Sequence, residues 1–169
     1  MRILFAKVVF FIILVPGAVV VIVPYLILRK SGMLDWPGIS STGILVGIFG
    51  VVFAGLALYC AWEFVVYGHG TPAPIDPPKV LVTQGLYRFN RNPMYVGIIG
   101  VILSEALFFG SMSLIVYAVI LWFAFHLFVV VYEEPHLRSK FGKAYQEYCL
   151  KVPRWGVALR QFRGEERTA

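Results

Sequence analysis

The chain has 169 residues, of which 59% are hydrophobic and only 14% charged, with a net charge of +6. Soluble domains are about 45–50% apolar and about 25% charged, and a chain of this size has no core large enough for so much apolar surface. With a mean hydropathy of +0.79, the composition excludes an ordinary soluble domain, a disordered chain and a disulfide-rich scaffold. It predicts an integral membrane protein in contact with the lipid bilayer. Membrane proteins are commonly basic, so we expect no nucleic-acid partner.

Two long apolar runs fill the N-terminal part of the chain. The first, residues 3–28, is interrupted only by Lys7, and the second covers residues 44–67. Each is long enough to cross a hydrocarbon core as a helix, which takes about 20 residues. Gly43 and Gly47 form a spacing of small residues that lets another helix approach closely and permits a homodimer. We therefore predict that residues 1–67 form two N-terminal transmembrane helices.

A polar segment at residues 68–92 precedes a third apolar stretch. Its early Gly and Pro residues preclude a continuous helix, and Asn92-Pro93 is typical of an N-cap followed by proline at the first helical position. Residues 94–132 would measure roughly 58 Å as one helix, about twice the thickness of a hydrocarbon core. A turn at residues 110–113 (Gly-Ser-Met-Ser) therefore predicts a helical hairpin with helices at 93–109 and 114–132.

The tail from Glu133 onward has an amphipathic pattern that Pro153 ends. Its apolar residues recur at helical spacing on one face: Leu137, Phe141, Tyr145 and Tyr148. Such a helix lies on the membrane surface or packs over the bundle. The expected fold is all-α: a polytopic membrane protein with about four transmembrane helices, a C-terminal helical hairpin and a cytoplasmic amphipathic tail helix.

The distribution of basic residues predicts the orientation. With four spans, the N-terminus, the segment at 68–92 and the tail lie on one side of the membrane. Every Lys and Arg except Arg29 and Lys30 then lies on that side. The positive-inside rule places this side in the cytoplasm. Both termini and both polar segments are therefore expected to be cytoplasmic, where a water-soluble cofactor can reach them.

Glu133 and Glu134 stand at the C-terminal end of an apolar helix, where the helix dipole disfavours negative charge. Two adjacent carboxylates also repel each other, so they need a cation or hydrogen-bond donors nearby. Arg88, Arg91 or a positively charged ligand is a candidate partner. We expect no metal site, because His136 is the only nearby residue able to extend a ligand set.

Two segments together resemble a known family. The first has the pattern G-x-Y-x-x-x-R-N-P-x-Y-x-G from Gly85 to Gly97. The second has the pattern E-E-x-x-L-x-x-x-F-G-x-x-Y-x-x-Y-x-x-x-V-P from Glu133 to Pro153. The order and spacing of these motifs around a hairpin resemble the membrane-embedded methyltransferases of the isoprenylcysteine carboxyl methyltransferase and phospholipid methyltransferase group, including its bacterial members. The resemblance implies that residues 68–169 form the catalytic region and that the protein lies in a bacterial-type inner membrane.

The resemblance implies that S-adenosylmethionine is the methyl donor, that S-adenosylhomocysteine is the product, and that the acceptor is lipophilic, an isoprenylcysteine-type carboxylate or a lipid. The implied cofactor-binding residues are Lys79, Val80, Leu81, Val82, Tyr87, Arg91, Asn92, Pro93, Met94, Tyr95, Glu133 and Glu134. Carboxylates suit the ammonium or the ribose diol of this cofactor, whereas Arg91 and Asn92 suit its carboxylate. The family histidine is Asn92 here. Because asparagine carries no proton near neutral pH, we expect position 92 to bind rather than to catalyse.

A carboxylate acceptor needs no base, whereas an amine, hydroxyl or thiol acceptor must lose a proton. His126, two turns before Glu133, is the candidate catalytic base, and Glu105 is the other acid in the hairpin. Two alternatives remain open. A membrane lipid reductase that uses NADPH, of the steroid-reductase type, has a similar tail architecture. A non-catalytic membrane partner or small transporter would place charges along a path across the bilayer, whereas here the polar residues gather on one side.

Overall fold

The computed structural model describes residues 16–34, 38, 40–68 and 79–158, and these residues form helices and loops without strands. The π-helical η1 (Ala18–Ile22) leads into α2 (Val23–Lys30), and α3 (Ser41–Val66) follows. A short 3-10 helix, η2 (Gly85–Arg88), precedes the hairpin of α4 (Pro93–Phe109) and α5 (Met112–Phe128). A π-helical turn, η3 (Val129–Glu133), then connects α5 to α6 (Glu134–Lys151). The predicted all-α class is confirmed for this part of the chain.

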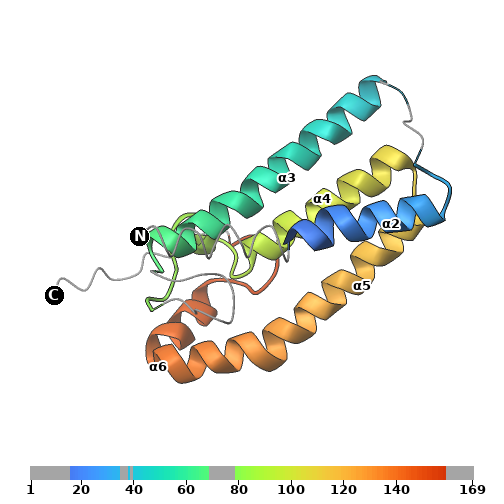
Figure 1. Ribbon diagram of the computed structural model, residues 1–169. Helices are drawn as coiled ribbons and strands as arrows, with labels where there is room; N and C mark the ends of the chain where they lie inside the picture. The colour runs from blue at the N-terminus through green and yellow to red at the C-terminus, as the bar shows by residue number, and fades with distance from the viewer. Residues whose placement is uncertain (1–15, 35–37, 39, 69–78, 159–169) are drawn as a thin grey trace.

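The helices pack as a bundle whose two ends differ. Figure 1 shows α3 alongside α4, with α2 between α4 and α5. The turn between α4 and α5 lies at one end of the bundle. The start of α4, the end of α3 and helix α6 lie at the other end. The start of the motif at Gly85–Gly97 and the motif at Glu133–Pro153 therefore meet at a single end of the bundle, as a shared ligand site requires.

The α4–α5 hairpin has the predicted turn. Gly110 adopts a left-handed conformation (φ 62°, ψ 29°) that ends α4, and the Ser111 hydroxyl accepts a hydrogen bond from the Leu114 amide at 3.4 Å to begin α5. Glycine tolerates this conformation without a steric cost, and serine is a favoured N-cap. The predicted bounds of the first hairpin helix are confirmed, whereas the second helix begins two residues earlier than expected.

Small residues let α3 and α4 approach closely, but they are not the pair expected from the sequence. A Cβ built on Gly97 would lie 2.9 Å from the Phe53 backbone oxygen, and one built on Gly100 would overlap the Phe53 ring. In contrast, Gly47 has nothing within 4 Å. The close contact therefore depends on glycines of α4, while the Gly43–Gly47 pair leaves open space at Gly47.

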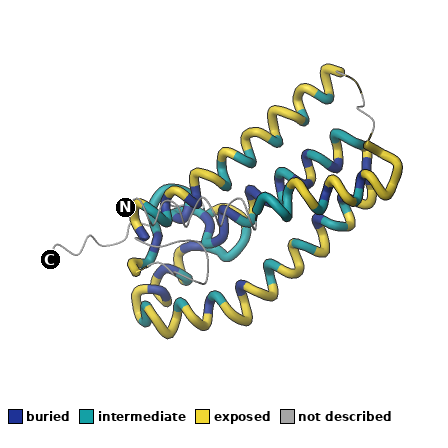
Figure 2. The backbone as a smooth tube through the Cα atoms, in the orientation of Figure 1, coloured by how far each residue is buried: buried dark blue, intermediate teal, exposed yellow. Residues whose placement is uncertain are grey.

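Two helical stretches are long and apolar enough to cross a membrane: Ser41–Val66 and Met112–Lys151. Helix α4 is apolar but shorter, and the beginning of the predicted first span lies outside the described residues. In the most apolar part of the two long stretches, only 11% and 17% of residues are buried. Figure 2 shows their exposed faces along the bundle. An apolar surface of this extent is typical of a protein that faces lipid.

The tail differs from the single amphipathic helix predicted for it. Helix α6 continues directly from the hairpin through η3, so no break separates the third apolar stretch from the tail. Gly142 then interrupts the helical geometry with φ 54° and ψ −124°, a conformation that residues with a Cβ rarely adopt. Beyond this kink, Tyr145, Tyr148 and Val152 form a buried cluster against Leu81. The tail therefore packs over the bundle, which is one of the two arrangements expected.

Candidate active site

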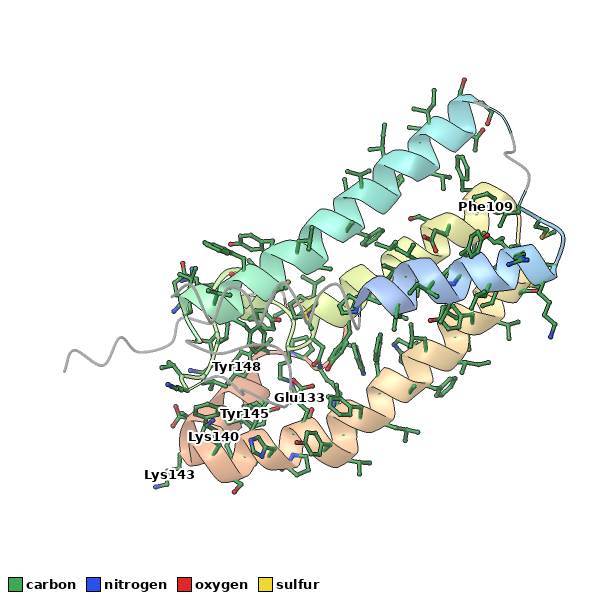
Figure 3. All side chains as sticks on the ribbon, viewed as in Figure 1. Phe109, Glu133, Lys140, Lys143, Tyr145 and Tyr148 are labelled. Carbon is green, nitrogen blue, oxygen red and sulfur yellow. The ribbon has the colours of Figure 1, made fainter. Side chains whose placement is uncertain are left out.

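A cavity lies at the end of the bundle where α3, the loop before α4, α4 and η3 meet. Its lining residues come from all four of these segments: Phe64, Tyr87, Arg91, Asn92, Met94, Tyr95 and Glu133. Figure 3 shows Glu133 at this end, near Tyr145 and Tyr148, with Phe109 at the opposite end of the bundle. The cavity thus combines one carboxylate, one guanidinium and three aromatic rings.

The loop before α4 holds Tyr87 as a buried wall of this cavity. Gly85 begins η2 with φ 52°, and a Cβ there would overlap the carboxylate of Glu63, so only glycine fits. The Tyr148 hydroxyl donates to the Tyr87 carbonyl at 2.6 Å, and the Phe64 and Tyr87 rings meet edge to face at 5.5 Å. Burial raises the pKa of the Tyr87 phenol well above its usual value. Tyr87 therefore presents a neutral phenol ring.

Asn92 is the N-cap residue of α4, as predicted, but its side chain does not form the cap. Its backbone has φ −130° and ψ 47°, and its side chain makes no capping hydrogen bond. Instead the Asn92 amide group donates to the Arg154 carbonyl at 3.1 Å, while the Asn92 backbone N–H donates to the Asn90 side chain at 2.6 Å. Pro93 does occupy the first helical turn as expected. The side chain of Asn92 therefore bonds to a segment distant in sequence, and no local sequence pattern predicts such a contact.

The two carboxylates of the acidic pair have different surroundings, and Glu134 is the neutralised one. Arg91 Nη1 donates to Glu134 Oε1 at 3.0 Å, and Arg154 donates to both oxygens, at 2.6 and 3.0 Å. We call Arg91, Glu134 and Arg154 the clasp. The hydrogen bonds to Glu134 raise the pKa of Arg154 above its ordinary value. Arg138 adds a distant ion pair at 3.9 Å, whereas Arg88, also a candidate, bonds to Gln84 instead.

Glu133 has no cationic partner among the described residues. Its Oε2 atom accepts a hydrogen bond from the neutral Tyr95 hydroxyl at 3.0 Å, and its side chain lines the cavity. The ring of Tyr95 packs in turn against Phe125 of α5, with ring centroids 4.6 Å apart. The π-helical turn η3 ends at Glu133, and such turns are frequent at functional sites because they redirect neighbouring side chains. The carboxylate of Glu133 is therefore the one available to a ligand.

Residues 152–158, which we call the C-terminal strap, close over the loop before α4. The Arg91 amide donates to the Pro153 carbonyl at 3.1 Å, and the Asn90 side chain donates to the Gly156 carbonyl at 2.7 Å. The Ala158 amide donates to the Phe89 carbonyl at 2.7 Å. The sequence offered the Val152-Pro153 end of the second motif but no sign that this segment returns to the loop.

The structure gathers only part of the predicted binding set around the cavity. Six of its residues line the cavity: Tyr87, Arg91, Asn92, Met94, Tyr95 and Glu133. Pro93 and Val82 are buried nearby, and Leu81 packs against the tail, whereas Lys79 and Val80 are exposed. His126 is not among the lining residues. Phe64, which lines the cavity, and Arg154, which bonds to Glu134, were not predicted as site residues. An aromatic residue in an apolar run and an arginine in a polar tail are both common, so their roles are evident only from the fold.

Comparisons with known proteins agree with the two motifs. The phospholipid methyltransferase family matches residues 40–144, which include α3, the hairpin and the start of α6. A probable protein-S-isoprenylcysteine O-methyltransferase from Oryza sativa subsp. indica is 30% identical over 115 residues, 68% of this chain and 59% of the relative. The protein-S-isoprenylcysteine O-methyltransferase of Schizosaccharomyces pombe is 32% identical over 88 residues, 52% of this chain and 37% of the relative.

The corresponding Mus musculus protein is 29% identical over 116 residues, 68% of this chain and 40% of the relative. The match thus spans 59% or less of the length of these three relatives. No solved structure matches the chain significantly. The family match covers more than half of the chain, and the Oryza sativa relative is 30% identical over 68% of it, so the chain belongs to the phospholipid methyltransferase and isoprenylcysteine carboxyl methyltransferase family.

Proposed function

We propose that this protein is an integral membrane methyltransferase that transfers a methyl group from S-adenosylmethionine to a lipophilic acceptor. The observation that carries the proposal is the asymmetry of the acidic pair. Glu134 is neutralised by two arginines, whereas Glu133 faces a cavity with only a neutral hydroxyl as partner in the described part of the chain. A carboxylate withdrawn from water without a counter-ion is costly. A cationic ligand removes that cost.

The chemistry of the lining residues fits this cofactor. Glu133 suits its ammonium or sulfonium charge. Arg91 suits its carboxylate, because Arg91 Nε is buried and has no hydrogen-bond partner among the described residues. The neutral ring of Tyr87 and the ring of Phe64 offer apolar faces for an adenine base. When bound, S-adenosylmethionine supplies an electrophilic methyl group: the S–CH3 bond breaks, its electron pair stays on sulfur as a neutral thioether, and the methyl carbon bonds to the acceptor atom.

The residues of this chain then act by binding, orienting and excluding water. Charge is dispersed in a methyl transfer, so alignment in a dry site is the main requirement. The loop before α4, to which the strap is hydrogen-bonded, lines one side of the cavity, and residues of the apolar helices α3 and α4 line another. We propose that the bundle forms about four spans with both termini and this site on the cytoplasmic face. The acceptor then enters from the bilayer, as an isoprenylcysteine carboxylate or a phospholipid.

The test is calorimetric titration of the detergent-solubilised protein with S-adenosylmethionine, comparing Glu133→Gln with Glu147→Gln. Glu147 is an exposed acid of α6 and serves as the matched control. A charged hydrogen bond contributes about 1.5–3 kcal/mol, so Glu133→Gln should weaken binding about tenfold to a hundredfold. The control should bind like the wild type. Absence of binding to the folded wild type, or equal affinities in both variants, contradicts the proposal.

A second measurement separates the enzyme classes. Thermal stabilisation by S-adenosylhomocysteine, with none by NADPH, is expected for a methyltransferase, and the reverse result indicates a reductase. Incubation with a methyl-labelled donor then identifies the acceptor class, using N-acetyl-S-farnesylcysteine and phosphatidylethanolamine as separate probes. Label in neither probe, with a total lipid extract also unlabelled, contradicts methyl transfer to a lipophilic acceptor.

A further inference from the structure

The imidazole of His126 is held by the C-terminal strap. Trp155 Nε1 donates a hydrogen bond to His126 Nδ1 at 3.0 Å, across 29 positions of sequence. The Trp122 ring stacks on the imidazole, with centroids 5.5 Å apart and an interplanar angle of 22°. Trp122 also lies 6.1 Å from Trp155, so two indoles and one imidazole form a compact cluster between α5 and the strap.

The direction of this hydrogen bond determines which ring nitrogen of His126 carries the proton of the neutral imidazole. An indole nitrogen only donates, so the His126 Nδ1 atom must accept and therefore carries no proton. In the neutral imidazole the single proton then resides on Nε2. A histidine in this state offers a hydrogen-bond donor on its free side. It offers no lone pair there with which to remove a proton, as the expected role of catalytic base would require.

The free side of His126 lacks a partner. Nε2 has no hydrogen bond to the residues that the structure describes, and it stands on an apolar helix two turns before Glu133. An unpaired polar group on an apolar helix is costly to place in lipid, and such groups commonly mark a functional site. The adjacent residue, Phe125, packs on Tyr95, whose hydroxyl contacts Glu133 in the cavity. His126 therefore lies one residue along α5 from the ring that packs on the cavity residue Tyr95, although its own side chain does not line the cavity.

We propose that Trp155 is a positioning residue that keeps the His126 proton on Nε2, and that His126 uses this proton to bind an anionic oxygen of the lipophilic acceptor. The proposed contact between His126 and the acceptor rests on the proposed function. It narrows the acceptor class to molecules that carry an anionic oxygen, in a carboxylate or a phosphate. His126 is then a binding residue for the acceptor and not a general base. The ring of Trp122, which is 37% exposed, supplies an apolar surface beside it.

The tautomer is tested without cofactor or acceptor. In the full chain labelled with 15N-histidine, the ring nitrogens of His126 are assigned by loss of their signals in His126→Gln; the chain has three histidines. We expect an unprotonated Nδ1 and a protonated Nε2 in the wild type. Trp155→Phe should produce a mixture of tautomers, whereas Trp62→Phe, at an exposed site on α3, should change nothing. A protonated Nδ1 in the wild type, or an unchanged tautomer in Trp155→Phe, overturns the positioning role.

The acceptor contact is tested by binding and by kinetics. A shift of the His126 Nε2 signal on addition of N-acetyl-S-farnesylcysteine supports a contact with a carboxylate. A shift on addition of phosphatidylethanolamine vesicles supports a contact with a phosphate. No shift with either probe overturns the contact, while the cofactor calorimetry decides the proposed function separately. With the active probe, His126→Leu should raise the acceptor KM about tenfold to a hundredfold, the worth of one hydrogen bond to a charged group, and His126→Gln should restore part of it. A fall in kcat of about a hundredfold or more, typical of a lost base, overturns the proposal.

Discussion

Replacing Glu134 with glutamine tests whether the clasp holds the loop, α6 and the strap together. The substitution keeps the shape of the side chain and one accepting oxygen but removes the charge that two arginines share. Arg91 and Arg154 approach this carboxylate to 3.0 and 2.6 Å, and the Glu134 side chain is 6% exposed. In Glu134→Gln the two guanidinium groups therefore face each other without a counter-ion.

The magnitude follows from burial. At an effective dielectric constant near 20, two charges about 3 Å apart attract by about 5 kcal/mol, before the cost of removing them from water. Loss of one partner from a buried ion pair typically destabilises a protein by about 3–5 kcal/mol. The Arg154 side chain is 31% exposed, so we expect the lower end, about 3 kcal/mol. Arg138, 57% exposed and 3.9 Å away, contributes little.

The assay is thermal unfolding in detergent, followed by tryptophan fluorescence. For a chain of this length, about 1 kcal/mol corresponds to about 2–4 °C in Tm, so Glu134→Gln should lower Tm by about 6–12 °C. Glu147→Gln, at an exposed position of the same helix, should change Tm little. Equal Tm values for the two variants would refute the reasoning, because they would mean that the clasp adds no net stability.

Two further substitutions test the glycines that allow close approach. Gly85→Ala should destabilise the protein more than Gly110→Ala. Both positions have a positive φ (52° and 62°), so alanine at either adds a backbone strain of about 1–2 kcal/mol. Of the two, only Gly85 would place the new Cβ in overlap with a side chain, that of Glu63. Equal losses of Tm would contradict this. Gly97→Ala should cost about 1–3 kcal/mol, because its Cβ would meet the α3 backbone at 2.9 Å, whereas Gly47→Ala, with nothing within 4 Å, should be nearly neutral. Urea titration in micelles measures the difference, and similar midpoints would count against close α3–α4 packing.

Local chemistry made some parts of this structure predictable. The helix at Pro93–Phe109 was predicted with its observed bounds, because proline begins it and a left-handed glycine ends it. The fold class followed from the length of the apolar runs. The kink at Gly142 was missed, since a glycine within an amphipathic pattern is compatible with both a straight and a broken helix.

The site was predictable as a set of residues but not as an arrangement. Both motifs pointed to one ligand site, and the hairpin between them brings Arg91 and Glu133 to the same cavity. The sequence could not show that Arg154 would neutralise Glu134 and leave Glu133 free. Which of the two adjacent carboxylates pairs with the arginines depends on the directions of side chains from three segments. The π-helical turn at the end of α5 changes those directions.

The sequence by itself determined that this is an apolar, helical chain, and it carries two motifs that resemble those of the methyltransferase family, because composition, span length, turns and motif spacing are local properties. Only the tertiary structure decided which charges are paired, how the strap returns over the loop, and that Trp155 contacts His126. Those contacts join residues far apart in the chain, so their geometry arises from the packing of the whole bundle rather than from any one segment.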